Sequence, residues 1–321
     1  MNDTRVRLRY LRQTIGLLFP GSGEARPYSL LPHPLLPRRL APRAWWHPGG
    51  KVMVPTGGDT IETYLSEVLG TPVRVALHVR PARRANRKPI LEARGPGGPV
   101  AFVKVGDTPR ARELVAHEAR TLGMLAEAPL KTVVAPAVLH HGSWRGLSVL
   151  ALSPLPVRRG TPGEDLRTAA IHEISALGGN SGNGAPAGSG TPGEKSAPGG
   201  GKRFAWHGDF SPWNIAPGPD GRLLVWDWER FGTGVPLGFD ALHHFFHRAL
   251  RRMRPVTAAR ACLAQALPLL APFGLSAGEA RLTAVHYLAV LADRHAADGH
   301  EPLGPPATWL TPVVDSQEVL T

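Results

Sequence analysis

The stretch Ala205-Trp-His-Gly-Asp-Phe-Ser-Pro-Trp-Asn-Ile215, or AWHGDFSPWNI, sets three polar side chains among bulky apolar residues. These are His207, Asp209 and Asn214, and a polar group in an apolar setting is costly unless it is hydrogen-bonded or meets a ligand. The neighbouring aromatic residues are predicted to pack the segment in place. The stretch therefore predicts a rigid loop that presents polar groups in fixed geometry.

The residues after this loop, NIAPGPDGRLLVWDWERF, favour a hairpin of two short strands. Asp220-Gly221 is a strong signal for a two-residue turn, and a turn centred there pairs Asn214 directly with Asp227. Such an oxygen-only pair suits Mg²⁺ when phosphates complete its shell. Asp209 lies on the preceding loop, close enough to orient or deprotonate a hydroxyl group.

A structural alternative exists for each of these residues. An Asp near a turn is commonly a cap or an Asx-turn residue, and an isolated HGD tripeptide is a weak signal. The joint spacing of Asp209, Asn214 and Asp227 is what favours a functional site. His207 is predicted to be a structural hydrogen-bonding residue rather than a proton carrier. The nearby tryptophans are predicted to be core residues: Trp206, Trp213, Trp226 and Trp228.

Two charged residues further upstream are predicted to form a buried ion pair. Lys104 lies within the apolar strand AFVKV, where an ammonium group needs a partner. Glu118 shares a helix face with Leu114 and Leu122, so it is expected to point at the core. The alternative is that Lys104 extends to solvent at a strand edge and that Glu118 is solvated. Beside the Asp and Asn set, we favour the ion pair.

The chain is predicted to have three parts. Residues 1–60 form a basic, Pro- and Arg-rich N-terminal layer. Residues 61–155 form a first lobe with strands at 73–79, 89–94 and 100–105, a helix that Thr108 and Pro109 open and that runs to about Ala126, and two strands within 134–153. Residues 156–321 form a second, mainly helical lobe.

Within the second lobe, Thr161-Pro-Gly-Glu164 is predicted to be a capping box that opens a helix to about Leu177. Residues 178–201 are dominated by Gly, with Pro and Ser, and are predicted to be a flexible loop because such a composition cannot build a packed core. Residues 236–297 carry helical patterns. Strands, one helix, further strands and then helices predict an α+β fold.

Composition excludes several classes of function. Hydrophobic residues make up 42% of the chain and charged residues 19%, which is typical of a globular protein. No apolar run is long enough to span a membrane, and no signal peptide is recognised. One cysteine, Cys262, fits a reducing compartment, so a cytoplasmic location is expected. The net charge of +12 comes without a nucleic-acid-binding motif, so no nucleic-acid partner is predicted.

Taken together, these residues resemble the aminoglycoside phosphotransferase and choline kinase family of kinase-like enzymes. The resemblance rests on Lys104, Glu118, the HGDFSPWN element and Asp227 in WDWE, and it covers about residues 73–300 in motif order. It implies a two-lobed protein-kinase-like fold with a small antiparallel-sheet lobe, a mainly helical lobe and ATP in the cleft between them.

The resemblance also implies a role for each matching residue. Lys104 would hold the α- and β-phosphates of ATP, with Glu118 positioning it. Asp209 would be the catalytic base, and Asn214 and Asp227 would hold Mg²⁺. The segment 147–156 would meet adenine, and Asp240 would brace the catalytic loop. Glu229 would either assist the metal or serve a surface or bracing role.

Two departures from the family pattern bear on the substrate. The loop 80–89, RPARRANRKP, has no glycine, and its basic residues either contact phosphates or form a solvated turn: Arg83, Arg84, Asn86, Arg87 and Lys88. The region between residue 156 and His207 is short and partly of low complexity, which implies a small or shallow acceptor site. Many aminoglycoside sites are acidic, so the basic charge disfavours a resistance enzyme.

These observations predict an ATP- and Mg²⁺-dependent phosphotransferase that moves the γ-phosphoryl group to a hydroxyl of a small metabolite or antibiotic. One alternative is a kinase for Ser or Thr hydroxyls of a peptide in a natural-product pathway. Another is a kinase-like binding module with little turnover, for which Mg²⁺-dependent nucleotide binding without phosphate transfer would be diagnostic.

Overall fold

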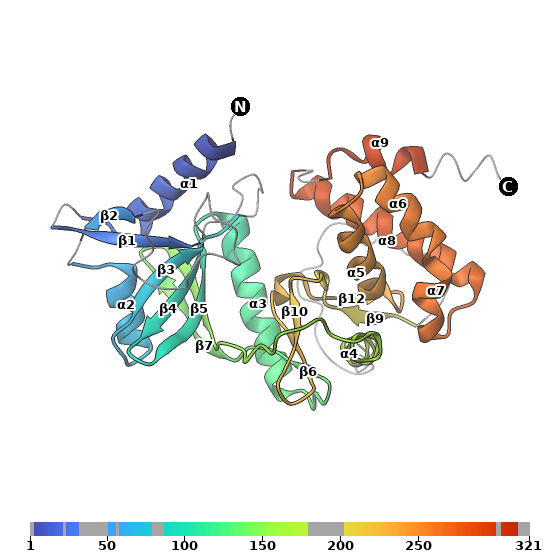
Figure 1. The fold of residues 1–321 in the computed structure, drawn as a ribbon, viewed down its shortest axis with the longest axis horizontal. Coiled ribbons are helices and arrows are strands. Elements are labelled where there is room, and N and C mark those ends of the chain that lie inside the picture. Colours follow the sequence, from blue (N-terminus) through green and yellow to red (C-terminus); the bar gives the residue numbers. More distant parts are fainter. Residues whose placement is uncertain are drawn as a thin grey trace. The chain divides into compact units, whose positions relative to one another are not determined.

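The protein divides into two compact units. The computed structural model describes residues 3–21, 24–31, 51–55, 58–78, 87–178, 202–299 and 303–313. Unit 1 comprises Met1–Ala126 and Pro136–Leu155, and unit 2 comprises Glu127–Ala135 and Pro156–Thr321. Figure 1 shows the elements of each unit, coloured along the chain.

Unit 1 is built on one sheet. In its described part, seven strands follow the order β2-β1-β3-β4-β5-β8-β7, and all neighbours are antiparallel except β1 and β3. The strands are β1 (Ala25–Leu31), β2 (Lys51–Pro55), β3 (Arg74–His78), β4 (Ile90–Gly95), β5 (Gly98–Gly106), β7 (Val138–Trp144) and β8 (Leu147–Leu152). The helices are α1 (Asp3–Leu18), α2 (Ile61–Val68) and α3 (Pro109–Glu127). The strands and the helix predicted within 73–153 are confirmed over the described residues.

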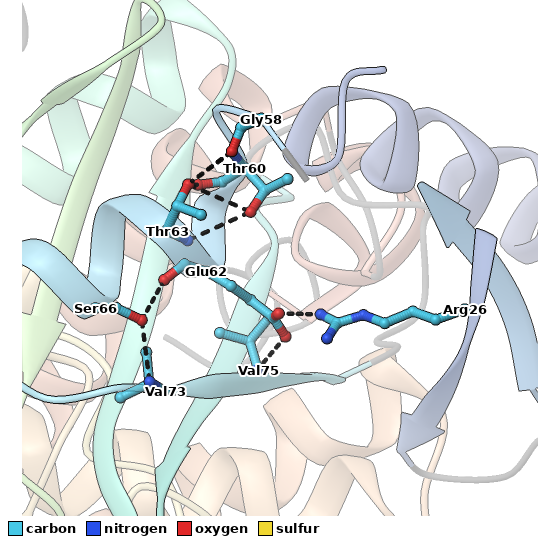
Figure 2. Close-up of polar contacts among 8 residues, drawn as sticks. All are labelled: Arg26, Gly58, Thr60, Glu62, Thr63, Ser66, Val73 and Val75. Carbon is cyan, nitrogen blue, oxygen red and sulfur yellow. Dashed lines mark hydrogen bonds and ion pairs between the residues drawn. The ribbon is translucent and has the colours of Figure 1, made fainter. Parts of the chain in front are cut away.

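Helix α2 is fastened to the sheet by its own polar side chains, as Figure 2 shows. Thr60 and Thr63 form a capping box at its start. Glu62 accepts a hydrogen bond from the backbone N–H of Val75 on β3 at 2.9 Å and forms an ion pair with Arg26 on β1. The contact with Arg26 therefore links β1 to α2. Residues of the predicted N-terminal layer 1–60 belong to unit 1, to which they supply α1, β1 and β2.

The passage from β5 to α3 is tight. A Cβ atom on Gly106 would lie 2.8 Å from the Cα of Arg112, so the backbone needs glycine there. Thr108 Oγ1 accepts from the N–H of Ala111 at 3.2 Å, which confirms its predicted capping role. This turn fixes where α3 begins relative to β5, the strand that carries Lys104.

Unit 2 is mainly helical, with short strands near its chain reversals. Its helices are α4 (Glu164–Ala176), α5 (Phe239–Leu250), α6 (Pro255–Ala264), α7 (Ala266–Leu270), α8 (Ala277–Ala297) and α9 (Pro306–Trp309), with 3₁₀ turns η1 (Trp228–Arg230) and η2 (Ala271–Phe273). Its strands are β6 (Val133–Val134), β9 (Phe204–Trp206), β10 (Ile215–Pro217), β11 (Leu223–Val225) and β12 (Gly232–Val235). An α+β protein with an antiparallel-sheet part followed by a mainly helical part is therefore confirmed.

The predicted capping box at Thr161 is wrong. Helix α4 begins at Glu164 with Gly163 as its N-cap residue, and no side chain caps it. Glu173 of α4 instead serves the neighbouring segment, accepting from the backbone N–H groups of Thr132 at 3.0 Å and Val133 at 2.7 Å. This contact holds β6 beside β11, with which it pairs in parallel.

The predicted register of the β10–β11 hairpin is also wrong, by one residue. Ile215 pairs with Val225, and the N–H of Trp226 donates to the carbonyl of Asn214 at 3.1 Å. The cause is a loop of three residues rather than two, since Gly218 N–H donates to Arg222 and Gly221 adopts a left-handed φ of 84°. Asn214 therefore lies opposite Trp226, and Asp227 is the next residue along.

Among the described residues, no single helix is long and apolar enough to cross a membrane. Helix α6 and the α7–η2 segment pass that test only when taken together, and the chain bends by 66° between them.

Candidate functional site

Asp240 braces the loop that carries the polar triplet. It lies in the first turn of α5, and the residue is only 2% exposed. Its carboxylate accepts from the backbone N–H of His207 at 2.7 Å and of Gly208 at 3.3 Å. Burial raises the pKa of Asp240 to about 7. The bracing role that the resemblance implied for Asp240 agrees with these contacts.

Gly208 leaves this loop little freedom. Its φ is 80°, and a Cβ atom would lie 2.0 Å from the carbonyl oxygen of Arg230. The guanidinium of the half-buried Arg294, from α8, donates to the carbonyl of Gly208. The same guanidinium lies 5.5 Å from the ring centroid of Trp206. Residues distant in sequence thus bind both backbone groups of Gly208: Asp240 accepts from its N–H, and Arg294 donates to its carbonyl.

His207 acts as the structural hydrogen-bonding residue that the sequence predicted. Its side chain is fully buried, and Nδ1 accepts from the backbone N–H of Asp209 at 3.1 Å. Its ring meets that of Trp228 edge-on at 4.5 Å between centroids. The imidazole therefore shapes the turn that leads to Asp209.

The carboxylate of Asp209 is held at both oxygens. Oδ2 accepts from Asn214 Nδ2 at 3.0 Å, and Oδ1 lies 3.1 Å from His243 Nε2. Asn214 Nδ2 also donates to the backbone carbonyl of Asp209 at 2.9 Å. The Asp209 side chain remains 25% exposed, so the oriented carboxylate is still accessible to a ligand.

The chemistry of Asn214 and Asp227 fits a hard cation. Both atoms that face Asn214 Nδ2 are acceptors, which fixes the orientation of the amide and makes its oxygen the candidate ligand atom. Asp227 follows the end of β11 and adopts a left-handed conformation with φ 73° and ψ 52°. Carboxylate and amide oxygens suit Mg²⁺, because Mg²⁺ is a hard cation that prefers oxygen ligands. It usually takes only one or two of them from the protein and fills its other positions with water or phosphate.

Three residues near Asp209 were not found by sequence reasoning. His243 and His247 lie one turn apart on α5, with ring centroids 4.1 Å apart, and Tyr287 OH lies 3.2 Å from His243 Nδ1. Burial lowers the pKa of both histidines well below the usual value, so both are neutral near pH 7. Each of Asp209, His243 and His247 has one atom of a kind that can bind a metal ion, and these three atoms lie within 4.8 Å of one another.

In unit 1, the structure contains the predicted ion pair. Lys104 Nζ donates to both carboxylate oxygens of Glu118, at 2.7 and 2.6 Å. Glu118 is fully buried and Lys104 nearly so, which excludes the solvated alternative. Leu114 and Leu122 are buried on the same face of α3, as predicted. The phosphate-binding role of the pair stays a prediction.

The remaining predicted residues divide as follows. Glu229 is buried, which excludes a surface role. Trp206 and Trp228 are core residues, but Trp213 is 43% exposed, so its predicted place in the core is wrong. Its ring meets that of His247 edge-on. In the basic loop, Arg87 and Lys88 are described, whereas Arg83, Arg84 and Asn86 lie outside the described residues, as do residues 179–201 of the predicted flexible loop.

The chain was compared with known proteins. No protein-family model matches it, and no curated sequence matches it significantly. Among solved structures, it is similar to a putative fructosamine-3-kinase from Haemophilus somnus 129PT (13% identity, 75% of this chain and 91% of that chain, TM-score 0.48). It is also similar to a macrolide 2'-phosphotransferase from Brachybacterium faecium (17% identity, 73% and 91%, TM-score 0.40). A choline kinase from Streptococcus pneumoniae is similar at 14% identity, with 72% and 98% covered and a TM-score of 0.37.

Proposed function

We propose that this protein is an ATP- and Mg²⁺-dependent phosphotransferase that moves the γ-phosphoryl group to a hydroxyl of a small metabolite or antibiotic, in the cytoplasm. The observation that carries the proposal is the carboxylate of Asp209. It is accessible, bound at one oxygen by the side-chain amide of Asn214, and carried on a loop that Asp240 braces. An oriented, accessible carboxylate is what a hydroxyl acceptor needs before attack.

Each group of the proposed site has one task. Asp209 accepts the hydrogen bond of the acceptor hydroxyl and takes its proton as that oxygen bonds to the γ-phosphorus, while the bond from the γ-phosphorus to the bridging oxygen breaks and ADP leaves. Asn214 and Asp227 supply oxygen ligands for Mg²⁺, which neutralises phosphate charge when it is bound. Lys104 contacts the nucleotide phosphates, and Glu118 keeps its ammonium group extended and charged.

The burial of the Lys104–Glu118 ion pair supports a role for Lys104 beyond stability. An ion pair as buried as Lys104–Glu118 is often no better for stability than well-packed apolar residues, because desolvation offsets the attraction. A chain that needs only a stable core can therefore dispense with both charges. A cation presented by a carboxylate partner is, by contrast, a common way to bind phosphate.

The test measures phosphate transfer from ATP across a panel of hydroxylated acceptors and to water, with and without Mg²⁺. We expect Asp209→Asn and Asp227→Asn to lower turnover at least about 10²-fold, since a positioned base alone contributes about 10²–10⁴-fold. Asp220→Asn is the matched control. It removes an exposed carboxylate in the hairpin turn, bonded only to Arg222 among its described contacts, and should leave turnover unchanged.

Each outcome of this assay is informative. Unchanged turnover in Asp209→Asn or Asp227→Asn would refute the proposal. Mg²⁺-dependent nucleotide binding, seen as a raised unfolding temperature but without transfer to any acceptor or to water, would show a binding module instead. Transfer to Ser or Thr peptides in preference to small molecules would change the acceptor class and retain the chemistry.

A further inference from the structure

His243 contacts the carboxylate oxygen of Asp209 that Asn214 does not bind. It lies on α5, its side chain is fully buried, and its Nε2 is 3.1 Å from Asp209 Oδ1. Its other ring nitrogen, Nδ1, is 3.2 Å from the hydroxyl of Tyr287 on α8. Both ring nitrogens of His243 are therefore engaged, and the three side chains form a continuous Tyr287–His243–Asp209 chain.

The direction of each hydrogen bond in this chain follows from chemistry. Burial keeps His243 neutral, so only one of its two nitrogens carries a proton. A carboxylate without a proton can only accept, which assigns that proton to Nε2. Nδ1 is then an acceptor, and the Tyr287 hydroxyl must donate to it. Burial raises the pKa of Tyr287 well above its usual value, so this hydroxyl keeps its proton.

The surroundings favour a fixed ring. His247 stacks on His243 at 4.1 Å between centroids and an interplanar angle of 30°, and the rings of Trp206 and Tyr287 meet it edge-on. The positive charge of Arg294 opposes protonation of His243. A neutral ring in a packed aromatic setting holds its donor in one direction, with little competition from water.

We propose that His243, oriented by Tyr287, is a positioning residue for the carboxylate of Asp209. Asn214 binds Oδ2 and His243 binds Oδ1, so the two contacts together prevent rotation of the carboxylate about its Cβ–Cγ bond. The acceptor hydroxyl then meets an oxygen whose remaining lone pairs point in a set direction. This inference rests on the proposed phosphotransfer, in which Asp209 is the base.

Two substitutions of equal polarity separate positioning from packing. In His243→Gln the side-chain amide nitrogen falls near the place of Nε2, so the donor to Asp209 is kept. In His243→Asn the amide falls near the place of Nδ1 and does not reach Asp209. For His243→Asn we expect kcat to fall about 100-fold, the loss that about 1 Å of misplacement can cause, with an unchanged KM for ATP. For His243→Gln we expect kcat within a few-fold of wild type.

The Tyr287→Phe variant tests the outer contact. It removes only the hydroxyl, so Nδ1 loses the hydrogen bond that helps to hold the ring in place, and kcat should fall between the values for wild type and His243→Asn. Unfolding temperatures of all three variants are measured as the control for folding. Equal kcat in His243→Gln and His243→Asn, when both are folded, would overturn the positioning role.

A measurement that needs no turnover separates this inference from the proposed function. Long-range ¹H–¹⁵N correlation spectra of the ¹⁵N-labelled full chain report the tautomer of His243, identified by the peaks lost in His243→Gln. We expect the Nε2–H form in wild type and also in Tyr287→Phe, because the Asp209 carboxylate still requires a donor at Nε2. A protonated ring, or the Nδ1–H form, in wild type would overturn the inference even if phosphate transfer is confirmed. If no phosphate transfer is found, the proposed function fails, and the tautomer still decides whether the His243–Asp209 contact is as described.

Discussion

Removing one member of the Lys104–Glu118 pair should destabilise unit 1 more than removing both. Glu118→Gln leaves the ammonium of Lys104 without its counter-charge, and Lys104→Met leaves the fully buried carboxylate of Glu118 uncompensated. Breaking one side of a buried pair typically costs about 3–5 kcal/mol. Replacing both residues, as Lys104→Met with Glu118→Leu, should lower the free energy of unfolding by about 1 kcal/mol or less, because no charge then stays buried.

The measurement is amide hydrogen exchange at β5 and α3. The two units need not unfold together, so one global transition would not report on unit 1. We expect each single variant to speed exchange of the slowest amides there by about two to three and a half orders of magnitude, and the double variant to recover most of that loss. Glu113→Gln on the same helix is the control. Its pair with Arg110 is exposed, so the change should stay within about 1 kcal/mol.

The reasoning is refuted if the amides of the single variants exchange as slowly as those of wild type. It is also refuted if the loss of stability in the double variant equals the sum of the losses in the two single variants. Either result would mean that the two charges are not coupled in a buried site. Loss of phosphate transfer in all three variants is expected in addition, but it does not test the electrostatic argument.

Two further outcomes follow from the site. Gly208→Ala should destabilise unit 2 and abolish activity, because the added Cβ would clash with the carbonyl of Arg230. Gly221→Ala is the control: Gly221 has a similar φ, but its Cβ would meet no atom within 4 Å, so the substitution should lower the free energy of unfolding by only about 1–2 kcal/mol in urea denaturation. Burial lowers the pKa of His244 to about 4, so the unfolded chain binds a proton that the folded chain does not between about pH 6.5 and 4. Stability should therefore fall by up to about 1.36 kcal/mol per pH unit through this group as the pH drops, and His244→Gln should flatten that slope in unfolding midpoints measured from pH 4 to 7. An equal slope in wild type and variant would contradict this.

Local patterns were sufficient for the parts of the site that lie close in sequence or follow a period. The i−4 and i+4 leucines around Glu118 predicted which way it points, and the five-residue spacing predicted that Asp209 and Asn214 belong to one site, where the structure has them in contact. These predictions succeeded because helix periodicity and loop spacing are short-range constraints.

The parts that failed depend on detail that a short pattern does not hold. Asp220-Gly221 fits a two-residue turn and also the end of a three-residue loop, and the choice shifts the whole register by one. His243 and Tyr287 approach Asp209 only because α5 and α8 pack beside the loop, so neither has a local signal. The contribution of β1 and β2 to the sheet is likewise long-range, and the Pro- and Arg-rich composition of 1–60 gives no alternation that would predict it.

The left-handed backbone of Asp227 affects how this protein would respond to selection for stability. Glycine adopts that conformation without strain, so Asp227→Gly would relieve about 1 kcal/mol of backbone strain while deleting a proposed metal ligand. A library screened only for heat resistance would then enrich variants that melt later and lack the carboxylate proposed to bind the metal. Thermostable variants of this chain should therefore be sequenced at position 227 before their melting temperatures are taken as an improvement.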